Sequence, residues 1–222
     1  LINQIIKKDS KHIITIEDPV EYVFTSQKGI ISQRQVEVDT NSFTSGIKYS
    51  LRQDPDVIFV GEIRDKETME VALKAAETGH LVLTTLHTND AVPTINRIVN
   101  MFEESNRHLI RKQLAEALRA TIAQKLVYSE KHNKRFPACE ILTVTPTIRD
   151  YIIKDNADAI YELVRENNID SMISMNMSLF LLASQDLISK QEAIENSNDP
   201  DELEKLLEEL KKSKIVIKRK KR

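Results

Sequence analysis

Two short apolar runs in the middle of the chain flank a segment whose apolar residues recur at helical spacing. The runs are Val57–Val60 and residues 81–85, and each lies between polar or glycine residues, which predicts strands buried on both faces. Asp65 precedes the intervening segment as a helix cap, and Gly79 follows its end, where a left-handed residue is favoured. Strand, helix and strand in this order form a βαβ unit, so we expect a parallel sheet.

Weaker patterns on either side of this unit complete an expected α/β core. Residues 13–16 form a β-branched run, which predicts a strand that ends at Glu17. Residues 25–41 mix polar residues with alternating apolar ones, which predicts a short hairpin or loop that carries Arg34. Helical spacing predicts further helices over residues 1–8, 43–51, 91–101 and 109–127, and the charged residues 128–136 are expected to form an exposed hairpin.

Strand signals stop after residue 145, and only helical patterns follow. They cover residues 147–154, 157–167, 176–187 and 190–196, and a last helix begins at Pro200 and reaches residue 212. We therefore expect a core over residues 1–145, a C-terminal all-helical appendage over 146–212, and a basic tail over 213–222. The tail ends in Lys-Arg-Lys-Lys-Arg, and a solvated end is favoured over contact with anionic lipid or nucleic acid.

Composition narrows the class of protein. The chain has 222 residues, 41% hydrophobic and 30% charged, with a formal net charge of -2, values typical of a globular protein without a general affinity for nucleic acid. A single cysteine, Cys139, excludes an intrachain disulfide and a zinc site built from several cysteines. No apolar run approaches the roughly 18 residues of a membrane span. Because Leu1 lies inside an expected helix, we expect a fragment whose N-terminal part is absent.

Polar side chains that could take part in catalysis or binding follow the expected strands. In a parallel sheet, strand carboxyl ends meet at one edge, where sites collect. The edge is expected to hold Glu62, Arg64 and Asp65 after one strand and His87 after the next. The strand that ends at residue 17 adds three carboxylates within five residues: Glu17, Asp18 and Glu21. Such clustering of like charge is costly unless a metal, a cation or water offsets it, although a solvated turn would also tolerate it.

Three segments resemble motifs of the type II/IV secretion ATPase superfamily. They are LRQDPDVIFVGEIRD, which resembles its Walker B signature, TGHLVLTTLHTNDA, which resembles its histidine box, and HIITIEDPVEYVF, which resembles its aspartate box. The resemblance runs to about residue 210. It implies a truncated RecA-like P-loop NTPase core of the α/β class with a mainly parallel sheet, and a hexameric motor that binds ATP and Mg²⁺.

The resemblance also suggests roles for the acidic residues. Glu62, beside Gly61 at a strand end, is placed like a Walker B acid that binds Mg²⁺ directly or through water. Glu17 or Glu21 can orient the attacking water, and spacing alone does not separate them. By resemblance we favour Glu21 as the water-orienting base, with Glu17 and Asp18 as its supports.

The basic residues and histidines have alternative roles. Arg34 and Arg52 are candidates for arginine fingers, and surface ion pairs are the alternative for each. His87 is expected to sense the γ-phosphate or to hydrogen-bond within the site. His80 is included with Gly61, Asp18 and Glu62 in the expected nucleotide-binding set, although its place before the strand also suits a structural role or a subunit contact. The two histidines are not expected to share a metal, because they fall on opposite faces of a continuous strand.

A phosphate-binding loop is not recognisable in the sequence. No G-x-x-x-x-G-K-[ST] segment occurs, and the four glycines are scattered. In the superfamily this loop opens a helix just before the aspartate-box strand, and residues 1–8 resemble the end of that helix. We therefore attribute the missing loop to truncation and expect the chain alone to hydrolyse no ATP, whereas the full-length protein is expected to be an ATP hydrolase.

Two features indicate the branch that retracts type IV pili during twitching motility. Residues 126–140 are short and hold only Cys139, whereas assembly and export ATPases usually carry a tetracysteine zinc insertion there, so no zinc is expected. Residues 147–154, TIRDYIIK, resemble the branch motif AIRNLIRE, but Ile153 replaces its second arginine. Gln35 stands where the branch usually has glutamate. These departures leave open an accessory paralogue of the retraction ATPase.

The resemblance implies partners and a location. They are a homo-hexamer, an inner-membrane pilus platform protein and a cytoplasmic position at the inner face of the cell membrane; no nucleic acid is expected. The alternatives are a pilus-assembly or type II secretion ATPase that has lost its zinc insertion, and a non-catalytic docking partner of such an ATPase.

Overall fold

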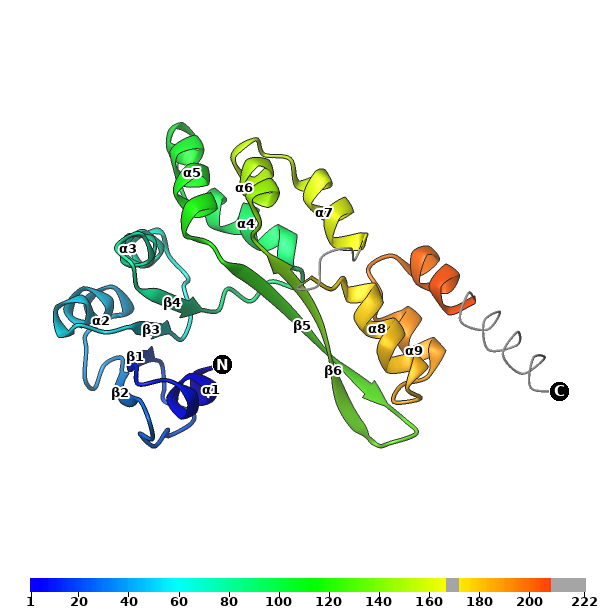
Figure 1. Ribbon diagram of the computed structural model, residues 1–222, viewed down its shortest axis with the longest axis horizontal. Coiled ribbons are helices and arrows are strands. Elements are labelled where there is room, and N and C mark those ends of the chain that lie inside the picture. The colour runs from blue at the N-terminus through cyan, green and yellow to red at the C-terminus, as the bar shows by residue number, and fades with distance from the viewer. Residues whose placement is uncertain (167–171, 209–222) are drawn as a thin grey trace. The chain divides into compact units, whose positions relative to one another are not determined.

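The structure, a computed structural model, describes residues 1–166 and 172–208. The chain forms two compact units (Figure 1), of which the first comprises Leu1–His87 and Arg97–Ala117. The second comprises Thr88–Asn96 and the residues from Leu118 onward. The expected basic tail and the end of the last helix lie outside the described residues.

A four-stranded parallel sheet forms the centre of the first unit and confirms the expected α/β class. Its order is β2-β1-β3-β4. The strands are β1 (His12–Glu17), β2 (Ile30–Gln35), β3 (Val57–Val60) and β4 (Leu81–Thr84). Because all four run in one direction, their carboxyl ends share one edge of the sheet.

Helices pack on both faces of this sheet (Figure 1). Ile6 of α1 (Ile2–Lys8) packs in one apolar cluster with Ile13 of β1. Helix α2 (Phe43–Ser50) lies against Ile16, whose side chain points to the opposite face because strand side chains alternate. A Cβ at Gly46 would lie 2.9 Å from Cγ2 of Ile16, so this close approach requires glycine.

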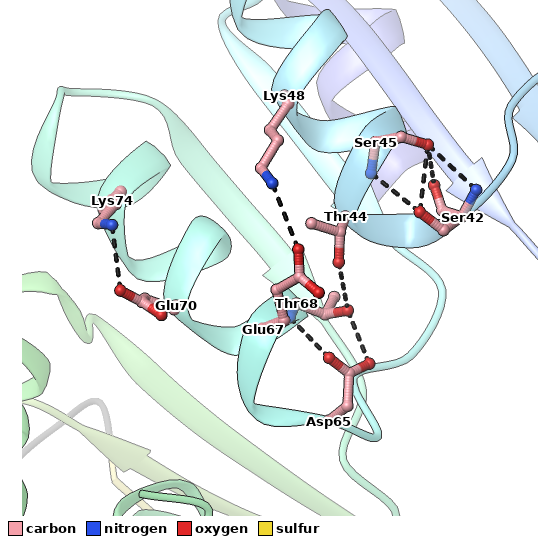
Figure 2. Close-up of polar contacts among 9 residues, drawn as sticks. All are labelled: Ser42, Thr44, Ser45, Lys48, Asp65, Glu67, Thr68, Glu70 and Lys74. Carbon is pink, nitrogen blue, oxygen red and sulfur yellow. Dashed lines mark hydrogen bonds and ion pairs between the residues drawn. The ribbon is translucent and has the colours of Figure 1, made fainter.

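Expected caps delimit the helices that follow β2 and β3. Ser42 caps α2 and forms a reciprocal capping box with Ser45. Asp65 caps α3 (Lys66–Glu77) by accepting hydrogen bonds from the Thr68 amide and hydroxyl, both at 2.8 Å (Figure 2). Gly79 follows α3 with a φ of 102°. The observations at Asp65 and Gly79 confirm the cap predictions made from the sequence.

The prediction of a hairpin or loop over residues 25–41 was wrong for residues 30–35. Residues Ile30–Gln35 form β2, which pairs in parallel with β1 and places Arg34 opposite Ile16. The alternating side chains gave a correct period, but parallel pairing with a distant strand cannot be read from local periodicity.

The prediction that residues 81–85 are buried on both faces was also wrong. In the described chain β4 pairs with β3 alone and forms an edge of the sheet. Leu81 is 42% exposed, and Thr84 is exposed as well. An edge strand has neighbouring side chains on one side alone, so its apolar composition did not ensure burial.

The first unit also contains a short 3-10 helix, Leu51–Gln53, and helix α5 (Arg107–Ala117), which packs beside α3. Another 3-10 turn, Glu104–Asn106, precedes α5. Helix α4 (Ala91–Asn100) begins among the residues of the second unit.

The helices expected over residues 1–8, 43–51 and 91–101 are confirmed to within about two residues, the usual uncertainty of helix ends.

The second unit is built from an antiparallel hairpin and a series of helices. Strand β5 (Ala120–Ser129) pairs with β6 (Lys134–Thr143). The helices are α6 (Pro146–Ile153), α7 (Ala157–Arg165), α8 (Met175–Ser184), α9 (Lys190–Glu195) and a helical segment over 200–208. Apolar residues of α8, α9 and the segment over 200–208 form a core with Val127 and Ala138 of the hairpin. The predicted helical series after residue 145 is confirmed in the described part of the chain. None of the described helices is long and apolar enough to cross a membrane.

The helix expected over residues 109–127 ends ten residues early, because α5 stops at Ala117 and β5 follows. Leu118, Ile122 and Leu126 are spaced by four, a spacing that fits one face of a helix and also one face of a strand. Burial alternates along β5, and Ile122 and Leu126 lie on its exposed face. Cross-strand pairing with β6 therefore outweighs the local helical pattern.

This hairpin also affects the domain organisation. The expected boundary after residue 145 separates the hairpin from the C-terminal helices, yet β6 packs against α8 and β5 against α9. The compact units of the structure accordingly divide near residues 87 and 117.

Glu140 of β6 is buried, with 5% of its surface exposed. Its Oε1 accepts a hydrogen bond from the Ala91 amide at 2.7 Å. Burial raises the pKa of this carboxyl above its ordinary value of 4.5, and the nearby Asp90 charge acts in the same direction. The Ala91 amide partly opposes both effects.

This shift predicts a pH dependence of stability. A raised pKa means that the folded protein binds the Glu140 proton more tightly than the unfolded chain does. The contribution of Glu140 to the free energy of unfolding is therefore fully present below about pH 4.5 and is lost as the pH rises through the pKa of the folded state. In denaturant titrations, the free energy of unfolding of the parent minus that of Glu140→Gln should fall as the pH rises over this range. Glu166→Gln, at an exposed site, controls for loss of one carboxylate. A parent-minus-variant difference that stays flat or rises with pH would contradict the assignment.

Candidate active site

Glu62 lies just beyond the carboxyl end of β3, and its side chain is only 12% exposed. Its Oε1 lies 2.6 Å from Nη2 of Arg64, and its Oε2 lies 3.1 Å from Nε2 of His87. Both carboxylate oxygens therefore have a nitrogen partner, one of them a guanidinium that is always charged.

The ends of β3 and β4 are tied together beside Glu62. The Thr85 hydroxyl donates to the Gly61 carbonyl at 2.7 Å, and the Ile63 amide donates to the Thr85 carbonyl at 3.2 Å. His87 then takes a left-handed backbone conformation, with φ of 51°, which is uncommon for a residue with a Cβ. These bonds fix the turn from which His87 reaches Glu62.

Glu17 ends β1 and is buried, with 8% of its surface exposed. Its Oε1 accepts hydrogen bonds from the Thr15 hydroxyl at 2.6 Å and from Nε2 of Gln33 at 3.0 Å. Glu21 lies four residues later on an exposed loop. The two candidates for orienting water thus differ in setting, because Glu17 is held by protein donors and Glu21 faces solvent.

One cavity of about 420 Å³ within the first unit brings most of the expected site together. Its lining includes Glu17, Asp18, Glu21, Gly61, Glu62 and His87. Mg²⁺ in nucleotide sites is usually held by one or two carboxylates together with phosphate oxygens and water. The oxygen donors of this lining fit that requirement, and Glu62 is the carboxylate that follows β3.

The two candidate arginines lie outside this group. Arg52 is exposed and lines a neighbouring cavity of about 600 Å³, which Asp18 also lines. Arg34 is on β2, and its Nη2 donates to Oε1 of Gln53 at 2.6 Å. Neither arginine is among the residues that line the cavity of Glu62.

His80 lies at the opposite end of β4 from His87. Its Nδ1 is 3.0 Å from the Ala75 carbonyl and 3.1 Å from the Thr78 hydroxyl, where α3 ends. This position does not bring His80 to the carboxyl edge of the sheet. It agrees better with the structural alternative considered for His80 than with nucleotide binding.

Gln33 is a site residue that the sequence analysis did not identify. Its amide contacts Glu17 and the backbone of the loop that carries Glu21. An isolated glutamine in a polar stretch carries no signal of its own. Only its position opposite Thr15 in the β1–β2 register could have indicated it.

Most of the chain matches the model of a known protein family. The model of the family described as type II/IV secretion system protein matches residues 1–196. The chain belongs to this family. The sequence resemblance is thereby confirmed.

Three relatives from Pseudomonas aeruginosa illustrate its range. The type IV pilus retraction ATPase PilT is 41% identical over 86% of this chain, and the type IV pilus ATPase PilU is 36% identical over 89%. Type II secretion system protein E is 40% identical over 62% of the chain. These matches cover 55%, 52% and 27% of the respective relatives. The chain thus spans about half the length of the two pilus relatives.

A solved structure supports the same conclusion. The crystal structure of the pilus retraction motor PilT with bound ADP is 45% identical and superposes with a TM-score of 0.84. The match covers 92% of this chain and 57% of the PilT chain. The fold of this protein is therefore that of a PilT-like ATPase.

Proposed function

We propose that the full-length protein, meaning this chain together with an upstream segment that supplies the phosphate loop, is a hexameric motor ATPase that retracts type IV pili. The observation that carries the proposal is the gathering of Glu17, Glu21, Glu62 and His87 around one cavity at the carboxyl edge of a parallel sheet. The ADP bound by the PilT relative supports a nucleotide as the ligand of this cavity.

The acidic residues of the cavity and His87 have chemical tasks in this proposal. Glu62 would hold Mg²⁺ directly or through water, and such an ion would supply positive charge against the β- and γ-phosphates. Glu21, exposed on its loop, accepts a hydrogen bond from the attacking water, and Glu17, which is buried, and Asp18, which is exposed, support that loop. His87, already hydrogen-bonded to Glu62, is placed to respond when the γ-phosphate leaves.

Retraction is favoured over assembly or secretion by two observations. The match to PilT extends over 86% of the chain and that to type II secretion system protein E over 62%. In addition, a short turn joins β5 and β6, and the single cysteine of the sequence, Cys139, lies on β6, so there is no tetracysteine zinc insertion at this point. We propose ATP and Mg²⁺ as the cofactors, and the ADP bound by the PilT relative supports the nucleotide.

The proposal includes the partners of a retraction motor. They are five further copies of the full-length protein and a pilus platform protein of the inner membrane, which the motor would engage from the cytoplasmic side. Assembly into a ring would place the exposed Arg52 at the surface of a neighbouring subunit.

Deletion of the encoding gene in its own host tests this function. We expect cells that still display pili but no longer retract or twitch, with recovery on expression of the full-length parent and none with Glu62→Gln. Loss of surface pili would favour an assembly ATPase, and loss of protein export would favour a secretion ATPase. Normal retraction in the deletion strain would contradict the proposal.

A further inference from the structure

Gln33 joins the two parts of the aspartate box through its side-chain amide. It lies on β2 opposite Thr15 of β1. Its Nε2 donates to Oε1 of Glu17 at 3.0 Å and to the Tyr22 carbonyl at 2.8 Å, and its Oε1 accepts from the Phe24 amide at 2.7 Å. Both amide hydrogens and the carbonyl oxygen thus have partners within the first unit.

These bonds hold the backbone directly after Glu21. Glu21 precedes Tyr22 in a loop that belongs to no helix or strand, and its side chain is exposed. A solvent-exposed loop with few regular hydrogen bonds opens easily unless side chains restrain it. Gln33 supplies two such restraints and connects them to Glu17, which a further bond from Thr15 holds in place.

We propose that Gln33 is a positioning residue for ATP hydrolysis, which fixes the loop of Glu21 relative to Glu17 so that Glu21 can orient the attacking water. The inference rests on the proposed function and deepens it. Gln33 touches neither water nor nucleotide in this role and acts through the two glutamates.

Neighbouring Gln35 offers a matched control. Its Oε1 accepts one hydrogen bond from the Val20 amide, at 3.3 Å. Gln35 therefore holds the same loop by a single longer bond at a position before Glu21. Gln35→Leu makes the same chemical change as Gln33→Leu, with a smaller expected effect on the loop.

Steady-state kinetics of the full-length protein separate positioning from folding. We expect Gln33→Leu to lower kcat by about 10- to 100-fold, because small misplacement of a catalytic group has costs of this order. The KM for ATP should change little, since Gln33 does not line the cavity. Gln33→Glu retains an acceptor for the Phe24 amide but removes both donors and faces Glu17 with a second carboxylate, so it should lose at least as much.

A double variant tests whether Gln33 acts through Glu21. If it does, Gln33→Leu should cause no further loss of kcat in a Glu21→Gln background, because groups that act as a unit are non-additive. An equal loss of kcat in both backgrounds would overturn the inference. So would a kcat near the parent value in Gln33→Leu.

Hydrogen exchange, measured on the 222-residue chain, tests whether Gln33 restrains the backbone of the Glu21 loop. We expect the amides of residues 22–24 to exchange about ten times faster in Gln33→Leu than in Gln35→Leu, since lost bonds promote local opening. Equal exchange in the two variants would overturn the positioning role. A full-length parent without turnover would instead overturn the proposed function, and the positioning role of Gln33 in hydrolysis with it.

Discussion

Replacement of Glu62 by glutamine in the full-length protein is expected to remove most ATP turnover while nucleotide binding is retained. The amide keeps the shape of the side chain but loses the charge that would hold Mg²⁺ and that faces Arg64 at 2.6 Å. Loss of a group that acts on a metal directly or through water typically lowers activity by at least about 10- to 100-fold. Phosphate release and fluorescent-nucleotide binding, measured on the same preparation, separate the two effects.

Glu70→Gln is the matched control for this change. Glu70 lies on α3 in an exposed ion pair with Lys74, and such pairs contribute little. The control should therefore turn over ATP at the parent rate. If Glu62→Gln also retained a rate within a few-fold of the parent, Glu62 would be a structural carboxylate that pairs with Arg64.

Removal of Arg52 is expected to have the larger effect. Arg52 is exposed and lines a cavity beside that of Glu62, so its guanidinium is open to a neighbouring subunit. Arginine fingers supplied by a neighbouring chain are worth roughly 10³- to 10⁵-fold in rate where they are established. Arg52→Ala in the full-length protein should accordingly reduce turnover to near background.

Mixing two inactive variants tests whether Arg52 acts across a subunit boundary. Full-length Glu62→Gln retains the arginine, and full-length Arg52→Ala retains the acids. Mixed rings would contain some complete sites and recover activity that neither parent preparation shows. Arg34→Ala, mixed in the same way, tests the second arginine, although its bond to Gln53 also agrees with a structural role.

Lys48→Ala provides the control for charge removal at the same surface. Lys48 lines the same cavity as Arg52 and pairs with Glu67 at 3.3 Å (Figure 2), with both side chains largely exposed. Its loss should leave turnover nearly unchanged. An inactive mixture, with mixed rings confirmed by native mass spectrometry, would rule out action of Arg52 in trans.

The carboxyl edge of the sheet was predictable from the sequence because three local signals agreed there. Apolar runs marked β1 and β3, polar residues marked their ends, and Asp65 and Gly79 marked the helix between β3 and β4. Each of these signals depends on neighbours within a few residues. Because β3 and β4 pair in parallel, Glu62 and His87, which follow these strands, lie close together at the same edge.

The errors arose where distant segments decide the structure. Ile122 and Leu126 are spaced as on a helix, and pairing with β6 made them part of a strand. Gln33 carried no local signal, because its role depends on lying opposite Thr15 across two strands. Leu81 was expected to be buried, and it is exposed because β4 is an edge strand in the described chain. Local periodicity reports neither partner nor register.

The roles of the site residues require a ligand to be tested directly. In the proposed function, the cavity lined by Glu17, Glu21, Glu62 and His87 is the site of ATP hydrolysis. A crystal structure of the full-length protein with Mg²⁺ and a non-hydrolysable ATP analogue is the most direct measurement. It should place Mg²⁺ on Glu62, directly or through one water, with the γ-phosphate facing Glu21 and His87. A nucleotide bound away from this cavity, or an ion held without Glu62, would contradict the account.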